Sequence, residues 1–444
     1  MAALFEGVRV LDLTNVLAGP FCCYQLGMLG ADVIKVERPE TGDLARELGA
    51  DPELNARYMG VSFLAQNAGK RSITLDLKAT AGKAIFMRLV ASADVVVDNF
   101  RPGVMARLGL GPDELRTVKP DLITCAISGY GKDSPLAADP AYDQIIQGLA
   151  GVMSVTGEGT LSGVGAPTRV NLTGEKNTPS QANTAIESED PTGVDGLRQV
   201  NAPRRAGLRV GYPVADTTGG MTAAFAIAAA LYRRAMTGEG EDIDVSMLDS
   251  TVVSMGWAVS NWLISGVAPM PMGNENVTAA PSGSFATADG LLNIAANKQE
   301  QFETLCRLLE RPELVDDPRF HERESRKANR YMLKAELERE LAMRPAADWA
   351  LLLNRHGVPA GEVLDVPAIV DHEHVRTRGL IKRFDKVPGA ERDIAIAGAG
   401  FRLGTGDPGP KTPPPELGAD NEALLGELGY DEAEISQFRA AGVI

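Results

Sequence analysis

The sequence predicts an α/β protein with one domain built on an open parallel β-sheet and a second, smaller α+β domain. Three observations support this fold class. Apolar strand-like segments alternate with helical segments up to residue 131, and a hairpin followed by three helical segments occupies residues 284–355. The chain of 444 residues is also too long for one ordinary hydrophobic core, so we expect two domains.

The first hundred residues contain the clearest alternation of strands and helices. Residues 7–14 alternate apolar positions and predict a strand, 18–30 predict a short helix after a Gly-Pro turn, and 31–37 predict a second strand. A strand–helix–strand unit of this size is typical of a parallel crossover. The same logic predicts further strands at 70–77, 94–100 and 122–131, with a helix at 80–93.

Open parallel sheets bind their ligands at the carboxyl ends of the strands. The segments that directly follow the predicted strands are therefore candidates for the site: 15–18, Arg38, 99–101 and 129–131. The first of these turns, LTNVLAGPF, lacks the GxGxxG pattern. A nicotinamide or flavin fingerprint is thus absent.

Basic residues cluster near the predicted strand ends, at Arg38, Lys70, Arg71, Lys78, Arg101 and Arg107. Taken singly, each is more simply a solvated surface charge. As a group on a chain of net charge −15, they predict a phosphate-binding patch. Asn99 and Phe100 could offer an amide and an aromatic face to a nucleotide; a strand-end turn and a core phenylalanine are the simpler interpretation.

The overall composition excludes several classes of protein. A net charge of −15 argues against general nucleic-acid binding. The N-terminus lacks the features of a signal peptide, and the longest apolar run, 221–232, is too short and too alanine-rich for a bilayer, so we expect a cytoplasmic protein without membrane segments. The four cysteines show neither metal-ligand spacing nor a disulfide framework, and no histidine precedes His321. We therefore expect chemistry without a metal.

A break in composition separates the two halves of the chain. Residues 143–211 contain no aromatic side chain, and 171–205 are rich in polar residues, Gly and Pro. This composition predicts a long surface loop or insertion, with a lid as the weaker alternative.

The second half begins with an alanine-rich helix after Gly211. Residues 242–265 predict a strand that runs into a long apolar helix, and 266–276 predict a linker. A hairpin at 284–296 should turn near Asp289-Gly290. Helices are expected at 298–310, 327–343 and 346–355, and the tail combines a Pro/Gly-rich connector at 404–418 with two short helices.

Asp216 stands at the start of the alanine-rich helix, with Gly219 and Gly220 just behind it. A carboxylate ringed by small residues can be reached by a bulky substrate and act as a nucleophile. The simpler interpretation is a helix N-cap, which the local pattern alone favours. Tyr142 and Asp143 begin another helix, and with Asp216 they would form a carboxylate–phenol–carboxylate group if the fold brings them together.

Several long blocks, in order, closely resemble the class III CoA-transferases, the family of formyl-CoA transferase and carnitine CoA-transferase. The resemblance extends over nearly the whole chain, and only the segment around 165–207 departs from it. The blocks are LDLTNVLAGPFCCYQLGMLGADVIKVERPETGD, NAGKRSITLDLK, ADVVVDNFRPGVMARLG, SGYG, YDQIIQGLAGVMSVTG, VADTTGGMTAAFAIAAALYRRAMTGEGEDIDVSMLD, APSGSFATADG and HGVPAGEVLDVPAIVDHEHVRTRGL.

Position by position, the resemblance implies that Asp216 is the nucleophile and that Tyr142 is an active-site aromatic beside it. It implies contacts with CoA at Asn15, Val16, Leu17, Ala18, Arg38, Leu75, Lys78, Asn99, Phe100 and Arg107. Pro140 departs from the formyl-CoA enzyme, which has a lysine there, and the glycine-rich shielding loop of that enzyme is missing near 273–284. Formyl-CoA:oxalate transfer is therefore not the expected reaction.

The resemblance also implies a Rossmann-like large domain built from both chain ends, a small domain between them, and a homodimer of interlocked subunits. The expected boundaries are 1–240 for the first part of the large domain, 241–275 for a linker, 276–350 for the small domain and 351–444 for the return to the large domain.

The activity implied is transfer of CoA from an acyl-CoA thioester to a carboxylic acid, through aspartyl anhydride and aspartyl-CoA thioester intermediates. CoA is then part of the substrate, and no permanently bound cofactor is expected. Succinyl-CoA or another dicarboxylyl-CoA is the expected donor, with Arg101 or Arg169 as candidates for its distal carboxylate. The alternatives are a racemase of α-methylacyl-CoA, whose histidine has no counterpart near Tyr142, and a CoA-binding subunit of a heteromeric transferase, against which the intact Asp216 argues.

Overall fold

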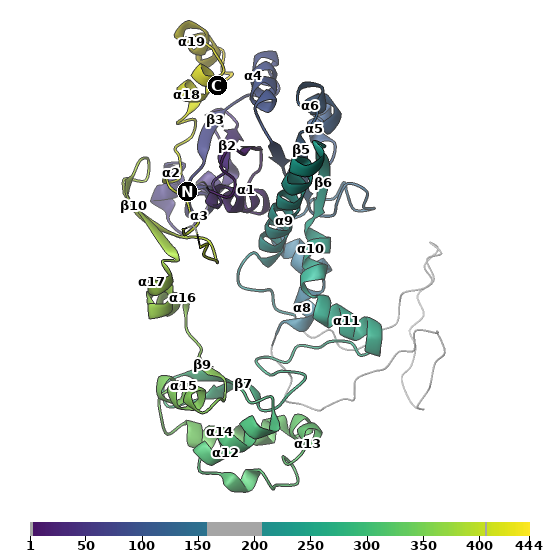
Figure 1. Cartoon of the computed structure of the whole chain (residues 1–444), viewed down its shortest axis with the longest axis vertical. Coiled ribbons are helices and arrows are strands. Elements are labelled where there is room, and N and C mark those ends of the chain that lie inside the picture. Colours follow the sequence, from purple (N-terminus) through teal and green to yellow (C-terminus); the bar gives the residue numbers. More distant parts are fainter. Residues whose placement is uncertain (1–2, 158–206, 405) are drawn as a thin grey trace, which may run out of the picture. The chain divides into compact units, whose positions relative to one another are not determined.

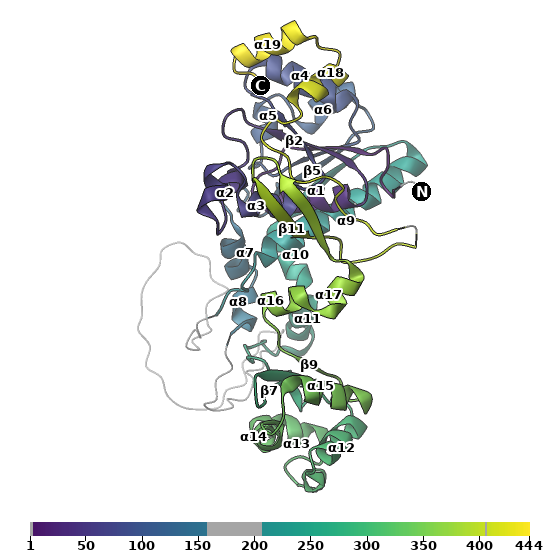
Figure 2. The same cartoon turned by 90° about the vertical axis from the view of Figure 1, so that its left-hand side faces the viewer.

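The computed structural model describes residues 3–157, 207–404 and 406–444 (Figures 1 and 2). The chain divides into two compact units. The first contains Met1–Val152, Val210–Met255 and Ile369–Ile444, and the second contains Met153–Arg209 and Gly256–Ala368. Arg169 and, except for Gly207, the insertion expected at about 165–207 lie outside the described residues.

A six-stranded sheet, parallel throughout, forms the centre of the first unit, in the order β3-β2-β1-β4-β5-β6. Its strands are β1 (Arg9–Asp12), β2 (Asp32–Glu37), β3 (Arg71–Thr74), β4 (Val95–Asp98), β5 (Ile123–Ser128) and β6 (Glu241–Ser246). The predicted parallel sheet is confirmed. The strand order reverses between β1 and β4, and the loops that follow these two strands diverge at a place where ligands of such sheets commonly bind.

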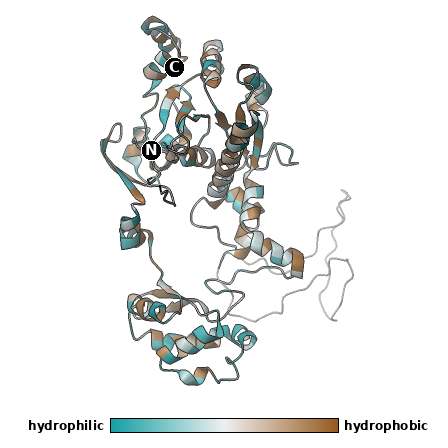
Figure 3. Ribbon diagram, in the orientation of Figure 1, coloured by the Kyte–Doolittle hydropathy of each residue, from teal (hydrophilic) through white to brown (hydrophobic). Residues whose placement is uncertain are grey.

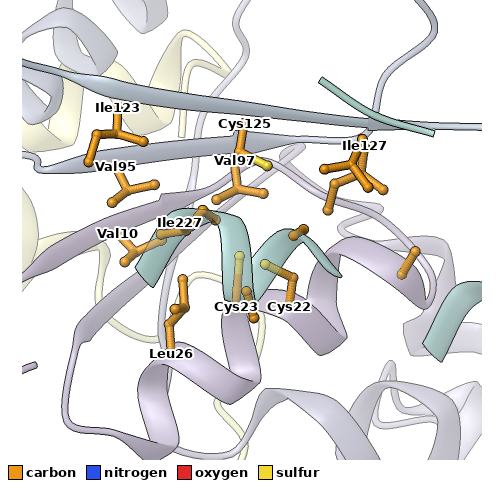
Figure 4. Packing of buried hydrophobic residues seen from close by; sticks show 14 of the residues in the cluster. Val10, Cys22, Cys23, Leu26, Val95, Val97, Ile123, Cys125, Ile127 and Ile227 are labelled. Atoms are coloured by element: carbon orange, nitrogen blue, oxygen red, sulfur yellow. The ribbon is translucent and has the colours of Figure 1, made fainter. Parts of the chain in front are cut away.

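Both faces of this sheet are covered by helices, so neighbouring residues of one strand pack into different layers. Val10 faces a core formed with α1 (Ala18–Met28) and α9 (Val214–Thr237), whereas Leu11 faces one formed with α4 (Thr80–Ala91) and the C-terminal helices. Figure 4 shows the first layer, in which strand residues such as Val95 and Cys125 meet Cys22, Cys23 and Ile227. Burial on both faces explains the nearly continuous apolar strands.

Shorter elements complete the first unit. They are η1 (Leu44–Glu47), α2 (Pro52–Ala56), α3 (Val61–Asn67), α5 (Val104–Arg107), α6 (Pro112–Val118), α7 (Asp143–Leu149), α8 (Val152–Val155), α10 (Met247–Ser254), α16 (Val366–Asp371), α17 (Glu373–Arg378), α18 (Asn421–Glu427) and α19 (Glu432–Ala440), of which α8 and α16 reach the boundary with the second unit. An antiparallel hairpin of β10 (Ile381–Val387) and β11 (Arg392–Ala397) was not predicted. Its alternating residues around Pro388-Gly389 were a usable signal.

The second unit contains the predicted hairpin and the three predicted helices. The hairpin consists of β7 (Ser282–Ala286) and β8 (Leu291–Ala295), and β9 (Ala360–Glu362) adds a third strand. The predicted helices are α12 (Gln299–Leu308), α14 (Arg330–Leu341) and α15 (Ala346–Arg355). The unit also contains α11 (Gly256–Ser265), α13 (Arg323–Ala328) and a short turn η2 (Pro312–Leu314). The single long apolar helix expected up to residue 265 is wrong, because the helix is interrupted at Met255.

Helix α9 is longer than the apolar run 221–232 suggests. Within the described parts of the chain, it is the one helix long and apolar enough, by length and composition alone, to cross a membrane. A helix of a protein core passes the same test, and 44% of its most apolar window is buried. Its buried residues, which include Ala223 and Ile227, pack against α1 and the sheet.

Candidate active site

Two adjoining hollows lie at the carboxyl ends of the strands, where the strand order reverses. The outer groove, of about 900 Å³, is lined by the loops after β1 to β4 and by residues of the C-terminal segment. The inner pocket, of about 260 Å³, is lined by the loops after β1, β4 and β5 and by the starts of α1, α9 and α10. Both are lined by Asn15, Phe100 and Arg101.

Most of the predicted site residues line these hollows. Arg38, Leu75 and Lys78 line the outer groove. Val16, Leu17, Ala18, Asn99, Tyr142 and Asp216 line the inner pocket, and Asn15 and Phe100 line both. Arg107 lines neither; it is the last residue of α5, and its side chain lies beside Gly103, which precedes that helix. The loops after the strands thus bring together residues that are up to two hundred positions apart in the sequence.

Apart from Arg107, the predicted basic patch divides into two groups. Arg38, Lys78 and Arg101 line the outer groove. Lys70 Nζ instead lies 2.7 Å from Asp12 Oδ2 in a fully buried ion pair, and Arg71 pairs with Asp32 at 2.6 Å. The assignment of Lys70 and Arg71 to a phosphate patch is wrong, since they stand at the amino end of β3 and not at its carboxyl end.

The C-terminal segment forms a wall of the outer groove that the sequence analysis did not assign. Leu417, Asn421 and Arg439 line it. Asn421 binds the edge of β3, where its Oδ1 accepts the Thr74 N–H at 2.8 Å and its Nδ2 donates to Thr74 Oγ1 at 2.8 Å. These bonds join residues 347 positions apart, and no local pattern in the sequence signals them.

Asp216 is the third residue of α9 and not its N-cap, so the capping interpretation is wrong. Pro213 occupies the N-cap position and offers no side-chain acceptor. Asp143 at the start of α7 fills that role, because its Oδ1 accepts the Ala215 N–H at 2.8 Å and the Asp216 N–H at 3.4 Å. Buried Gln147 donates to Asp143 Oδ2 at 2.7 Å. The carboxylate of Asp216 therefore remains available to the inner pocket.

The surroundings of Asp216 favour its neutral form. Burial raises its pKa to about 7, and the nearby charge of Asp143 acts in the same direction. The backbone amide of Ala18, at the start of α1, opposes both, because its N–H favours the charged form and so acts to lower the pKa of Asp216. A carboxyl group with this pKa changes its charge near neutral pH, as expected of a group with a chemical role.

Gly219 and Gly220 serve helix packing and do not open a path to Asp216. Both are buried, and neither lines the inner pocket. A Cβ atom on Gly220 would lie 2.4 Å from the Ala18 carbonyl oxygen, whereas one on Gly219 would lie 3.0 Å from Met247 Cγ. The missing Cβ at Gly220 thus lets α9 approach the start of α1 closely, which brings the Ala18 amide to Asp216.

Asn99 fixes one loop of the site against another. Its Oδ1 accepts the Asn15 N–H at 2.8 Å, and its Nδ2 donates to the Asn15 carbonyl at 2.8 Å. These bonds join the loops after β1 and β4 across the strand-order reversal. Tyr142 precedes α7 and is 67% exposed. The expected carboxylate–phenol–carboxylate group is only partly formed, because Asp143 is directed to the backbone of α9.

In the described ranges, the cysteines and the acidic residues form neither a disulfide nor a group suited to bind a metal ion. Cys22, Cys23, Cys125 and Cys306 are all buried and free. Among the residues with described positions, no group of three or more His, Cys, Asp or Glu side chains is arranged to hold a metal ion.

Comparisons with known proteins agree with this arrangement. The chain matches the model of CoA-transferase family III over residues 5–174 and 191–421. It is 36% identical over 430 residues to the acetyl-CoA:oxalate CoA-transferase of Acetobacter aceti, covering 97% of each chain. It is 32% identical to the succinyl-CoA:glutarate CoA-transferase of Mus musculus, covering 99% of this chain and 90% of that relative.

A solved structure is similar over nearly the same extent. The crystal structure of a CAIB/BAIF family protein from Brucella suis superposes with a TM-score of 0.76 at 31% identity, covering 96% of this chain and 100% of that chain. The resemblance noted in the sequence is confirmed by these matches. The chain belongs to CoA-transferase family III and is a CoA-transferase.

Proposed function

We propose that this CoA-transferase moves CoA from a short dicarboxylyl-CoA donor to a carboxylic acid, with Asp216 as the covalent nucleophile. The observation that carries the proposal is a partly buried carboxylate, Asp216, in a pocket that adjoins a groove whose lining includes Arg38, Lys78 and Arg101. Arg38, Lys78 and Arg101 match the phosphates of CoA in charge, and Phe100 offers a ring at the junction of the two hollows.

The reaction proceeds by four exchanges at carbonyl carbons. An Asp216 oxygen attacks the thioester carbonyl of the donor, the C–S bond breaks, and CoA thiolate leaves a mixed anhydride. The thiolate then attacks the aspartyl carbonyl and releases the donor acid, which gives an aspartyl-CoA thioester. The acceptor carboxylate attacks this thioester and expels the thiolate. The thiolate finally attacks the acceptor acyl carbonyl of the second anhydride, which forms the product and regenerates the Asp216 carboxylate.

The inner pocket supports a short donor with a distal carboxylate. Its volume is about 260 Å³, and Arg101 is the one cation among the described residues that line it. One relative is named for a dicarboxylyl donor, succinyl-CoA, and the other for acetyl-CoA, whereas both named acceptors, glutarate and oxalate, are dicarboxylic acids. Arg101 also lines the outer groove, so its contribution to donor choice has to be separated from binding of CoA itself.

Replacing Arg101 by glutamine separates these contributions. We expect kcat/KM with succinyl-CoA to fall about tenfold more than kcat/KM with acetyl-CoA, because a charge-assisted contact with the distal carboxylate is lost. Lys78→Gln is the matched control, since Lys78 lines only the outer groove and its loss should lower both values equally. Steady-state transfer assays with both donors and a panel of acceptor acids measure this. Equal losses in Arg101→Gln would exclude Arg101 as the contact of the distal carboxylate, and a wild-type preference for acetyl-CoA would contradict the dicarboxylyl donor.

The pH dependence of transfer tests the charge state of Asp216. Burial raises the pKa of Asp216 to about 7 and only the ionised carboxylate attacks, so kcat/KM should rise as pH passes about 7 and fall below it. Asp143→Asn keeps an acceptor for the Ala215 N–H but removes a like charge, and should move this limb to lower pH. The other titratable side chains lining the pocket are Arg101, Tyr130, Asp139 and Tyr142. If the acidic limb of the pH profile of kcat/KM were unchanged in Asp143→Asn, that limb could not be assigned to Asp216.

A homodimer is part of the proposal. Helix α9 exposes Phe225, Tyr232 and Met236, each by more than two thirds. Helix α11 has no buried residue although it includes Trp257, Leu263 and Ile264 (Figure 3). Exposed apolar surface of this extent is typical of subunit interfaces. The racemase alternative has less support, because no histidine is among the residues that line the inner pocket.

A further inference from the structure

The loop after β1 contains an unusual backbone conformation at Val16. Its φ is +67°, in the left-handed region, and it is the one β-branched residue with positive φ among the residues whose placement is described. Branching at Cβ makes this region especially unfavourable. Such strain persists only where the surrounding structure fixes the residue in place. Val16 lines the inner pocket, so the contacts that hold it bear on the active site.

A buried ion pair holds the backbone on both sides of Asn15. Asp43 Oδ1 accepts the Val16 N–H at 2.9 Å, and Lys35 Nζ donates to the Thr14 carbonyl at 2.9 Å. The two side chains pair with each other, with Lys35 Nζ 2.9 Å from Asp43 Oδ2, and their exposed fractions are 0% and 1%. Two buried opposite charges thus bind residues 14 and 16 at once.

Asn99 holds the residue between them from the opposite side. It binds both the N–H and the carbonyl of Asn15, each at 2.8 Å. The backbone of three consecutive residues is therefore fixed by side chains from β2, from the start of η1 and from the loop after β4. Directly after Val16 the chain enters α1, whose first residue, Ala18, lines the inner pocket together with Asp216. The backbone amide of Ala18 acts to lower the pKa of the Asp216 carboxyl group.

We propose that Asp43, paired with Lys35, is a positioning residue for CoA transfer, which holds Val16 in its left-handed conformation so that the first turn of α1 faces Asp216. This inference rests on the proposed role of Asp216 as the nucleophile. The simpler role of Asp43 is to cap η1, because its Oδ1 also accepts the Ala45 N–H at 2.9 Å. A capping role alone affects stability but gives Asp43 no influence on Asp216.

Two double variants differ in the side-chain oxygen of residue 43, which accepts both the Val16 N–H and the Ala45 N–H, and a third change at Val16 separates these contacts. Lys35→Met/Asp43→Ala removes both charges together and also the acceptor for the Val16 N–H. Lys35→Met/Asp43→Asn removes the same charges but keeps a side-chain oxygen as acceptor, so it is the matched control. Neither variant leaves an unpaired buried charge, which favours folding. The titratable groups around Asp216, which are Arg101, Tyr130, Asp139, Tyr142 and Asp143, are unchanged in both.

We expect kcat/KM of the alanine double variant to be about tenfold or more below that of the asparagine control, as is usual for a misplaced reacting group. Its acidic limb should also move to higher pH, because Asp216 loses the amide that opposes its raised pKa. Adding Val16→Gly to the alanine variant should restore both values to within about threefold of the control, since glycine adopts positive φ without strain.

Each outcome of this experiment is decisive. If the two double variants share one pH profile and one kcat/KM, or if Val16→Gly restores nothing, Asp43 is only a cap and the proposal is overturned. Thermal unfolding of every variant shows whether a loss of activity is merely a loss of folded protein. Failure of the nucleophile assignment is seen separately, because wild-type transfer would then survive replacement of Asp216.

Discussion

Replacement of Asp216 by alanine is expected to lower kcat for CoA transfer by about 10⁴-fold or more, because every exchange in the proposed mechanism passes through this carboxylate. CoA should still bind, since Arg38, Lys78 and Phe100 of the outer groove are unchanged. Coupled transfer assays and calorimetric titration with CoA measure the two properties independently. Undiminished turnover would exclude Asp216 as the nucleophile.

Trapping of the aspartyl-CoA thioester is a second test of Asp216 as the nucleophile. Hydroxylamine cleaves an aspartyl-CoA thioester and leaves a hydroxamate on the aspartate. Wild-type protein incubated with acyl-CoA and hydroxylamine should carry this modification on the peptide containing Asp216, and protein without acyl-CoA should not. An unmodified peptide under turnover conditions would argue against covalent catalysis.

Asp216 should also lower the free energy of unfolding of the protein near neutral pH. The folded-state pKa of Asp216, about 7, lies above its ordinary value of 3.8, so folding favours the protonated form. The free energy of unfolding therefore falls as pH rises from about 4 to about 7. Asp216→Asn removes this titration and, above about pH 7, should be more stable than wild type by one to a few kcal/mol.

Replacement of Lys70 by methionine should lower the free energy of unfolding by about 3–5 kcal/mol, because it leaves a buried carboxylate unpaired. Lys70 and Asp12 have no exposed side-chain surface, and Lys70 also donates to the Pro20 carbonyl at 3.0 Å. Burial alone would raise the pKa of Asp12, but the charges of Lys35 and Lys70 outweigh it and hold that pKa at about 2. Denaturant unfolding of wild type and variant measures the loss.

The control is Asp12→Asn/Lys70→Met, in which neither charge remains. We expect the free energy of unfolding of this double variant to lie much closer to that of wild type than does that of Lys70→Met. Replacing both members of a buried ion pair is far less destabilising than removing one. A folded-state pKa below 3.8 also means that the contribution of Asp12 is complete above about pH 4 and disappears as pH falls through about 2. Equal losses in the single and double variants would show that packing, and not charge, determines the effect.

The strands and the larger helices were predictable because their signals are local. Apolar periodicity located β1, β2, β4 and β5, and the rule that parallel sheets bind ligands at strand ends indicated the loops that line the site. Position-by-position resemblance added residues such as Leu75 and Tyr142, which line the hollows. Arg101 was recognised as basic, but nothing local shows that it reaches both hollows.

The errors share a physical cause, which is that side chains distant in sequence determine local roles. Asp216 has the pattern of an N-cap, yet Asp143, 73 residues earlier, supplies the acceptor and α9 begins at Val214. Lys70 has the pattern of a surface cation, yet Asp12, 58 residues earlier, draws it into the core. Arg71 stands at the amino end of both the predicted strand 70–77 and β3, and Asp32, 39 residues earlier, pairs with it there.

The contribution of the last helices to the outer groove has a consequence for synthesis of the protein. Residues near Asn15 leave the ribosome early, whereas Asn421 and Arg439, which line the same groove, are added near the end of translation. A growing chain can form β1 to β5 but lacks one wall of the binding site until residues 417–444 have emerged. The groove proposed to bind CoA is thus complete only after residues 417–444 have folded onto the sheet, and a ribosome stalled late in translation would display a sheet without this wall.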